Sequence, residues 1–113
     1  MKRHKYNARK VTIDGHRFDS KREAERYGEL KLLERAGEIR DLELQPRFTL
    51  QDSFIRKGKR YREIDYIADF VYQDAEGNRI VEDVKGMKTE VYKIKRKMFI
   101  KRHGEFYEHR EVS

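Results

Sequence analysis

The sequence predicts a single α+β domain in which helices cover a mixed sheet and a small hairpin precedes the core. Two segments show helical spacing between a capping residue at one end and a glycine at the other. Runs with strand composition lie between them, and one more strand follows the second helix. A strand, a helix and a strand in succession imply a crossover, which makes part of the sheet parallel. The 113 residues suffice for one domain with a modest core.

The chain begins with a basic segment. Residues 1–10, MKRHKYNARK, contain five Lys or Arg residues and predict a mobile arm, which is either a binding arm or a disordered terminus. The domain is expected to cover residues 11–113. It opens with a hairpin over residues 11–18, VTIDGHRF, which turns at Asp14-Gly15 because Gly15 readily takes a positive φ.

The first helix is predicted over residues 20–37. Ser20 can cap its start, Glu23 stands at the third helical position, and Gly37 follows its last turn. An inward stripe recurs at helical spacing and consists of Ala24, Tyr27, Leu30, Leu33 and Ala36.

Three strands and a loop should follow. Residues 42–51 alternate as a strand, in which Pro46 favours a sheet edge or a bulge. Residues 53–62, SFIRKGKRYR, are interpreted as a basic loop. Residues 63–72 and 79–85 are two further strands.

The second helix is predicted over residues 89–104, between Thr89 as cap and Gly104 as stop. The residues expected to face inward are Val91, Ile94, Met98 and the stem of Lys101. The opposite face is basic and carries Lys93, Lys95, Arg96, Lys97 and Arg102. Residues 105–112, EFYEHREV, form the last strand.

The two strands around the turn at residues 74–78 place charged residues opposite each other. If Gln73 faces Arg79, paired numbers sum to 152, so Asp69 lies opposite Asp83 on one face. Lys85 shares that face because side chains alternate along a strand, and Glu82 points to the other face in a structural role. A slip of one residue would instead pair Asp69 with Glu82. The first register is favoured because it gathers both aspartates and the lysine.

Two carboxylates this close repel each other unless a cation lies between them. Mg²⁺ binds carboxylate oxygens and substrate phosphate, and a neighbouring lysine can hold the attacking water. Such a set of groups hydrolyses phosphodiesters. The alternative is a cross-strand charged pair on a solvated sheet face.

The charge balance indicates a polyanionic partner. The chain has 28 Lys and Arg against 21 Asp and Glu, a formal charge of +7, which favours nucleic acid over the alternative of a protein that is merely basic. It has no cysteine, so disulfides and cysteine-based zinc or nucleophilic sites are excluded. No apolar run approaches the roughly 20 residues of a membrane span and no signal peptide is recognised, so no membrane partner and a cytoplasmic location are expected.

An acid on one strand and Asp-x-Lys on the next, in the order αβββαβ, resemble the PD-(D/E)xK nuclease superfamily. The segments FDSKREAERYGELKLLERAGEI, LELQP, YIADFVY and VEDVKGMKT resemble more closely a family of small phage-encoded proteins of the DUF1064 type. The core is also similar to archaeal Holliday-junction resolvases and to the nuclease subunit of some transposition systems. The resemblance implies a restriction-endonuclease-like core. Ala68 stands where the superfamily's proline would be.

The resemblance implies a metal site. Asp69 matches the first motif aspartate, Asp83 the second acid and Lys85 the lysine, and Glu23 matches a helix-borne glutamate that completes the site. Glu23, Asp69 and Asp83 would hold Mg²⁺, with Mn²⁺ able to substitute, and Lys85 would orient or activate water. Glu23 also has a competing interpretation as a capping-box partner of Ser20.

Phosphate-binding candidates lie on the second helix and in the basic loop. They are Lys93, Lys97, Arg56, Lys57, Lys59 and Arg60, each with the alternative of a solvated surface charge. The leading hypothesis is a Mg²⁺-dependent DNA endonuclease with a resolvase-like role that acts as a homodimer. The second is a non-catalytic module that binds nucleic acid or a phage protein. The third is an interaction protein whose charges all lie on the surface.

Overall fold

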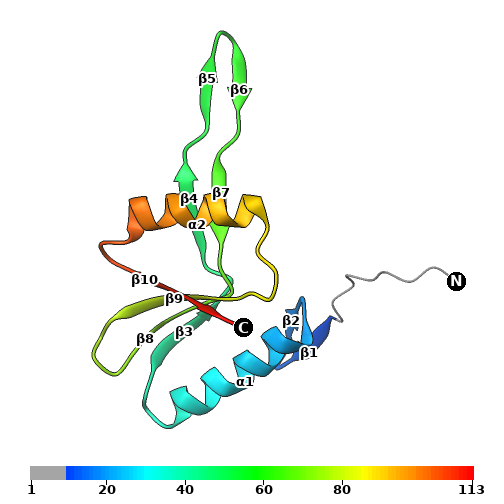
Figure 1. Ribbon diagram of the computed structural model, residues 1–113, viewed down its shortest axis with the longest axis vertical. Coiled ribbons are helices and arrows are strands. Elements are labelled where there is room, and N and C mark those ends of the chain that lie inside the picture. Colours follow the sequence, from blue (N-terminus) through cyan, green and yellow to red (C-terminus); the bar gives the residue numbers. More distant parts are fainter. Residues whose placement is uncertain (1–9) are drawn as a thin grey trace, which may run out of the picture.

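The computed structural model describes residues 10–113, and its centre is a four-stranded mixed sheet (Figure 1). The strands are β3 (Arg40–Leu44), β8 (Phe70–Gln73), β9 (Arg79–Val84) and β10 (Glu108–Val112), in the order β10-β9-β8-β3. The pair β9–β10 is parallel and the other two pairs are antiparallel. The α+β class, the mixed sheet and the crossover are therefore confirmed. The proposed basic arm lies almost wholly in residues 1–9, outside the described residues.

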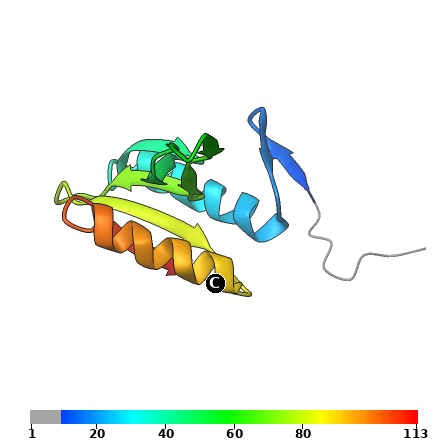
Figure 2. The same cartoon turned by 90° about the horizontal axis from the view of Figure 1, so that it is seen from above.

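Two helices cover opposite faces of this sheet. Helix α1 (Lys21–Arg35) packs Tyr27 and Leu30 against one face, and α2 (Glu90–His103) packs Phe99 against the other. Figure 2 shows the sheet between the two helices. Because side chains alternate between the two faces of a strand, neighbours on β9 belong to different hydrophobic cores. Ile80 lies in the core under α1, and Val81 lies in the core under α2.

The helix ends follow the predicted caps. The Ser20 hydroxyl accepts a hydrogen bond from the Glu23 amide (3.0 Å), and Gly37 adopts φ +80° just after α1. The Thr89 hydroxyl accepts from the Tyr92 amide (3.1 Å), and Gly104 caps the end of α2. These caps are formed by residues within one turn of each helix end, which is why the sequence could locate both helices.

The buried face of α2 differs in part from the prediction, although Met98 packs against the core as expected. Val91 and Ile94, expected to face inward, are 62% and 57% exposed, whereas Phe99 is fully buried, with Tyr92 half-buried beside the same cluster. Helix α2 carries two apolar stripes, and the stripe with larger aromatic rings removes more apolar area from water. The other stripe is left on the surface.

Two predicted strands each divide between two sheets. The run over residues 42–51 breaks at Gln45-Pro46 into β3 and β4 (Arg47–Gln51), and the run over residues 63–72 breaks at Ala68-Asp69 into β7 (Ile64–Ile67) and β8. The breaks are hydrogen-bonded to each other: the Gln45 amide donates to the Asp69 carbonyl (2.9 Å) and the Ala68 amide to the Pro46 carbonyl (3.1 Å). Pro46, which has no amide hydrogen, thus marks the point where the chain leaves the central sheet.

The prediction of a loop over residues 53–62 is wrong. These residues form a hairpin of β5 (Phe54–Arg56) and β6 (Lys59–Tyr61), which projects from the body beyond β4 and β7 (Figure 1). The N-terminal hairpin, β1 (Val11–Ile13) and β2 (His16–Phe18), is as predicted, with its turn at Asp14-Gly15. Neither helix in the described part of the chain is long and apolar enough to span a membrane.

Candidate functional site

The favoured register of the central hairpin is confirmed. Strands β8 and β9 pair Phe70 with Glu82 and Gln73 with Arg79, so paired numbers sum to 152. Asp69 is the residue before β8 and continues this pairing toward Asp83 on β9. The two aspartates therefore meet at the break between β7 and β8.

Asp69 and Asp83 hold each other in place through the backbone. The Asp69 amide donates to Asp83 Oδ1 (3.1 Å) and also to the Glu82 carbonyl (3.2 Å). The Val84 amide donates to Asp69 Oδ2 (2.8 Å). Each carboxylate thus accepts one hydrogen bond from the partner strand, which fixes where the two acids lie.

Two residues that the sequence did not indicate complete the surroundings of Asp83. The Tyr66 hydroxyl donates to Asp83 Oδ2 and lies 2.8 Å from His109 Nε2, while Asp83 itself is 1% exposed. Burial and the Asp83 charge raise the pKa of Tyr66 well above its usual value, so it remains a hydrogen-bond donor. His109 comes from β10 opposite Val81, a parallel pairing that no local signal specifies.

Glu23 projects from the first turn of α1 and is 6% exposed. Of the reciprocal capping box, only the Ser20 hydroxyl bond to the Glu23 amide is present within residues 10–113. Burial and the nearby Asp69 charge raise the pKa of Glu23 to about 7. A buried carboxylate without its expected capping bond is available for another partner.

The electrostatics link all four predicted catalytic residues. Burial raises the pKa of Asp69 to about 6, and the Asp83 charge adds to this effect. The Lys85 charge lowers the pKa of both Glu23 and Asp69, which opposes these shifts. Lys85 Nζ lies 4.7 Å from the centre of the Tyr92 ring, so α2 supports the lysine next to the acids.

Glu82 has the structural role predicted for it. It is fully buried on the α1 side of the sheet, and Arg26 binds both of its oxygens at 2.6 and 3.0 Å. The Tyr72 hydroxyl donates to the same carboxylate (2.7 Å). Bidentate pairing satisfies this buried charge, so Glu82 is not available to a ligand.

The three predicted ligands have the chemistry of a hard-cation site. Across residues 10–113, no three His, Asp or Glu side chains already stand together as a metal-binding group. Yet Glu23, Asp69 and Asp83 are oxygen donors, and two of them have raised pKa values that a nearby divalent cation would lower. A carboxylate oxygen that accepts one hydrogen bond keeps a second lone pair. These three side chains therefore have the chemistry that Mg²⁺ and Mn²⁺ prefer, but within residues 10–113 they are not gathered closely enough to form a metal-binding group.

A family model described as "Protein of unknown function (DUF1064)" matches residues 3–112. The chain belongs to the DUF1064 family. No curated protein and no solved structure matches it. The matched DUF1064 segment contains the whole central sheet, both helices and every residue of the candidate site.

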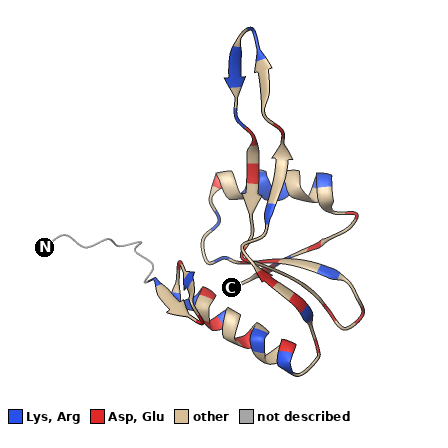
Figure 3. Ribbon diagram, turned by 180° about the vertical axis from the view of Figure 1, so that it is seen from behind, with Lys and Arg blue, Asp and Glu red and all other residues tan. Residues whose placement is uncertain are grey.

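The predicted phosphate-binding cations of this DUF1064 protein form two groups (Figure 3). Lys93 and Lys97 are exposed on α2, and Lys93 is within 3.4 Å of Glu90. The other group is exposed on the β5–β6 hairpin and comprises Arg56, Lys57, Lys59 and Arg60. Helix α2 packs on β4 and β7, at the base of that hairpin.

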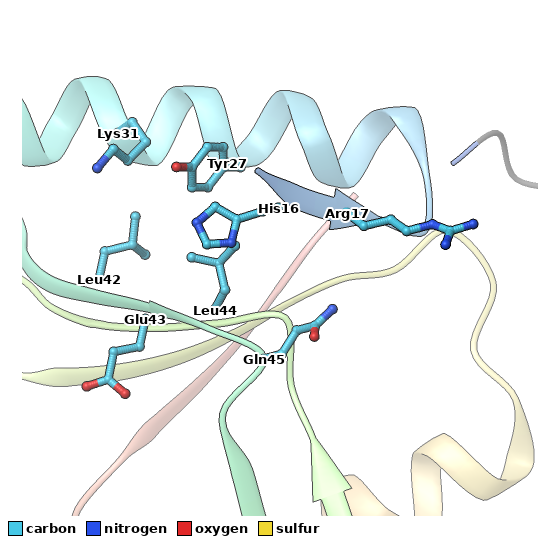
Figure 4. Close-up of a pocket in the computed structure, with 8 residues that line it drawn as sticks. All are labelled: His16, Arg17, Tyr27, Lys31, Leu42, Glu43, Leu44 and Gln45. Atoms are coloured by element: carbon cyan, nitrogen blue, oxygen red, sulfur yellow. The ribbon is translucent and has the colours of Figure 1, made fainter. Parts of the chain in front are cut away.

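A separate pocket of about 450 Å³ lies between the N-terminal hairpin, α1 and β3 (Figure 4). His16, Tyr27 and Leu44 face into it, while Arg17 points away. None of the predicted acids lines this pocket in the DUF1064 chain. Gln45, which lines the pocket, is connected to the site because its amide donates a hydrogen bond to the Asp69 carbonyl.

Proposed function

We propose that this DUF1064 protein is a metal-dependent DNA endonuclease of the PD-(D/E)xK kind. One observation carries the proposal: Asp69 and Asp83 are held side by side at a strand break, in the register that also brings Lys85 to that edge. Glu23 lies within electrostatic reach of all three. Buried acids with raised pKa values beside a lysine are typical of catalytic sites.

The residues would divide the work as follows. Glu23, Asp69 and Asp83 would hold Mg²⁺ or Mn²⁺, which when bound polarises a phosphoryl oxygen and lowers the pKa of bound water. Lys85 would hold the attacking water or a phosphate oxygen while it rests on the Tyr92 ring. Tyr66 would position Asp83, and exposed Lys93 and Lys97 would contact the DNA backbone.

A resolvase-like role with a homodimer as the active form is part of the proposal. One site cuts one strand, so cutting both strands of a branched or duplex substrate calls for two sites. Exposed Val91 and Ile94 on α2 give a second copy an apolar surface to cover.

A second candidate is a DNA-binding module without catalysis. Asp69 and Asp83 each accept a hydrogen bond from a backbone amide near the strand break. These two hydrogen bonds would by themselves explain why two acids are buried there. Under this alternative both acids stabilise the bend between β7 and β8, and cleavage does not occur.

The deciding experiment compares wild type, Asp83→Asn and Lys85→Met on labelled four-way-junction, duplex and single-stranded DNA. Each reaction contains Mg²⁺, Mn²⁺ or EDTA. Glu105→Gln, at an exposed position after α2, is the control for loss of a carboxylate. Wild type and Glu105→Gln should cut only with metal, and the two site variants should lose about 100-fold or more, since metal-site interactions contribute several kcal/mol.

Equal cutting by Asp83→Asn, or cutting in EDTA, would overturn the proposed site. Metal-independent binding by all variants with no cutting of any DNA would instead favour the binding module.

A further inference from the structure

The hairpin that the sequence presents as a loop lies beyond the pair of strands β4 and β7 and extends it outward, after a short unpaired stretch at residues 52–53 and 62–63. Strands β4 and β7 pair Arg47 with Ile67, and beyond a register shift after Thr49 the pairing resumes at Gln51. Strands β5 and β6 continue it to the tip. From Gln51 to Gly58 the chain advances seven residues, or about 23 Å at the usual rise of a strand. We call the part over residues 53–62 the basic ribbon.

The basic ribbon is stiffened by its own contacts. Lys57 and Gly58 have φ of 52° and 75°, the signature of a two-residue type I′ turn that matches strand twist. Phe54 and Tyr61 are cross-strand partners whose rings stack with centres 4.9 Å apart at 11°, and Lys59 Nζ lies 5.1 Å from the centre of the Tyr61 ring. An isolated two-stranded hairpin is only marginally stable in water. The aromatic and cation contacts stabilise this one, which indicates that the arm is already formed before a ligand binds.

The charge of the basic ribbon is of one sign. Its ten residues contain no Asp or Glu, and all five cations are exposed, namely Arg56, Lys57, Lys59, Arg60 and Arg62. None of the five forms a salt bridge within residues 10–113. Five like charges close together repel one another, and a bound polyanion would relieve this repulsion. The charge of the basic ribbon therefore indicates a polyanionic partner.

The cations lie on both faces of the ribbon. Arg56 and Lys59 pair with each other and share a face with the aromatic pair, while Arg60 pairs with Ile55 on the opposite face. The phosphate-lined walls of a DNA groove present charge on both sides of an inserted element. The B-DNA major groove, about 12 Å wide and 8.5 Å deep, admits a two-stranded ribbon, whereas the narrow major groove of duplex RNA does not.

We propose that the basic ribbon is a DNA-binding arm that lies in the major groove of a duplex next to the cleavage site. The cations on its two faces contact the flanking phosphates, and Ile55, which is 70% exposed, is the apolar group able to reach thymine methyls. Phe54 and Tyr61 stack on each other and serve to brace the ribbon. This inference rests on the proposed function for its choice of DNA, and it adds that the substrate needs duplex beside the site.

The ribbon also sets how far that duplex extends. Eleven residues separate Gly58 from Asp69, so the tip lies at most about 36 Å from the acids. That reach corresponds to about one turn of duplex DNA. A substrate arm of roughly ten base pairs should therefore contain the whole contact.

The test measures equilibrium binding of the full chain to a 20-base-pair duplex in EDTA, so that cutting plays no part. The ribbon variant is Arg56→Gln, Lys57→Gln and Arg60→Gln together, which removes charge from both faces and leaves the Lys59–Tyr61 contact in place. The charge-matched control is Arg17→Gln, Lys21→Gln and Arg35→Gln, three exposed cations away from the ribbon. A second duplex carries bulky C5-substituted pyrimidines, which fill the major groove, and a third is RNA.

The ribbon variant should bind the plain duplex at least about tenfold more weakly than the control, with the slope of log affinity against log salt smaller by about 3. Blocking the major groove should weaken wild type and leave the ribbon variant little changed. Both variants should keep the wild-type melting temperature, because the altered side chains are exposed.

Equal binding by the two variants, no effect of the blocked groove, or equally ribbon-dependent binding to RNA would each overturn the inference. These outcomes are separate from the nuclease proposal. If binding depends on the ribbon but no metal-dependent cutting occurs, the nuclease proposal is rejected and the ribbon inference stands. If metal-dependent cutting occurs but binding does not depend on the ribbon, the ribbon inference is rejected and the nuclease proposal stands.

Discussion

Burial of the Glu23 and Asp69 carboxylates reduces the free energy of unfolding by an amount that depends on pH. Their pKa values in the folded chain are about 7 and about 6, above the ordinary 4.5 and 3.8. Between the ordinary and the raised values the folded state binds more protons than the unfolded state. The free energy of unfolding must then fall as pH rises through this window.

The first prediction follows from that sign. With respect to these two groups, metal-free protein should be most stable below about pH 4 and should lose stability as the pH rises to about 7.5. Glu23 accounts for at most about 3 kcal/mol, since each pKa unit corresponds to 1.36 kcal/mol. Chemical denaturation of wild type and Glu23→Gln in EDTA at pH 5 and pH 7.5 measures it, and the variant should show the smaller difference.

Addition of Mg²⁺ or Mn²⁺ should restore stability at pH 7.5 more than at pH 5, because protons compete for the same carboxylates. Asp83→Asn should weaken this response. A wild-type melting temperature that does not respond to either metal at pH 7.5 would contradict the assignment of these acids as ligands.

The second prediction concerns Tyr66, whose hydroxyl joins Asp83 to His109. Tyr66→Phe keeps the ring in its aromatic cluster but removes the donor from a buried carboxylate, which should cost about 1–3 kcal/mol. Tyr61→Phe, at a 40% exposed position on the ribbon, is the matched control and should change stability by less than about 0.5 kcal/mol. If the proposed function holds, Tyr66→Phe should also lower kcat more than it changes KM.

Among the elements, helix α2 gives the clearest contrast between the sequence and the structure. Phe99 is fully buried against the sheet, whereas Ile94, the residue favoured by helical spacing, is on the surface. Phe99→Ala should cost about 3–5 kcal/mol and Ile94→Ala less than about 1 kcal/mol, as measured by urea denaturation of protein diluted until it is monomeric. The reverse order would mean that α2 packs through its other stripe.

Local chemistry accounts for the elements that sequence reasoning located. Ser20, Gly37 and Thr89 act within a turn of their own helix, and the register of β8 and β9 follows from a short turn. Sequence alone could not choose between two apolar stripes on α2, because that choice depends on which residues of β4 and β7 meet the helix. The same limit hid Tyr66 and His109, which reach Asp83 only through tertiary contacts.

The basic ribbon was missed for a different reason. Its charge suggested a loop, and Lys57-Gly58 is not among the commonest turn pairs for a tight hairpin. Phe54 and Tyr61 are nevertheless symmetric about that turn, as are Ile55 and Arg60. The pairing arithmetic that located Asp69 opposite Asp83 would have located this hairpin as well.

Among the described residues, the basic ribbon projects beyond the body formed by the central sheet and the two helices (Figure 1). In this arrangement one apolar stripe of α2 lies on the surface, and that stripe includes Val91 and Ile94. A second copy that covered this stripe would bring two sites into one particle.

A further prediction tests that arrangement. Wild type should elute as a dimer in size-exclusion chromatography with light scattering, and Ile94→Glu should shift it to a monomer because a charge on the stripe cannot be desolvated cheaply. Leu32→Glu, at a 63% exposed position on α1, is the control and should leave the dimer intact. A monomeric wild type at micromolar concentration would contradict the homodimer.

The break at Ala68-Asp69 has a mechanical consequence. Strand β7, one side of the ribbon's base, ends at Ile67, only two residues before Asp69, and the Ala68 amide ties this joint to Pro46. The ribbon and Asp69, the first of the proposed catalytic acids, are therefore joined through Ala68 alone along this strand. A ligand that displaced the ribbon would therefore act on the position of Asp69 relative to Asp83, against the two backbone hydrogen bonds that hold these acids together.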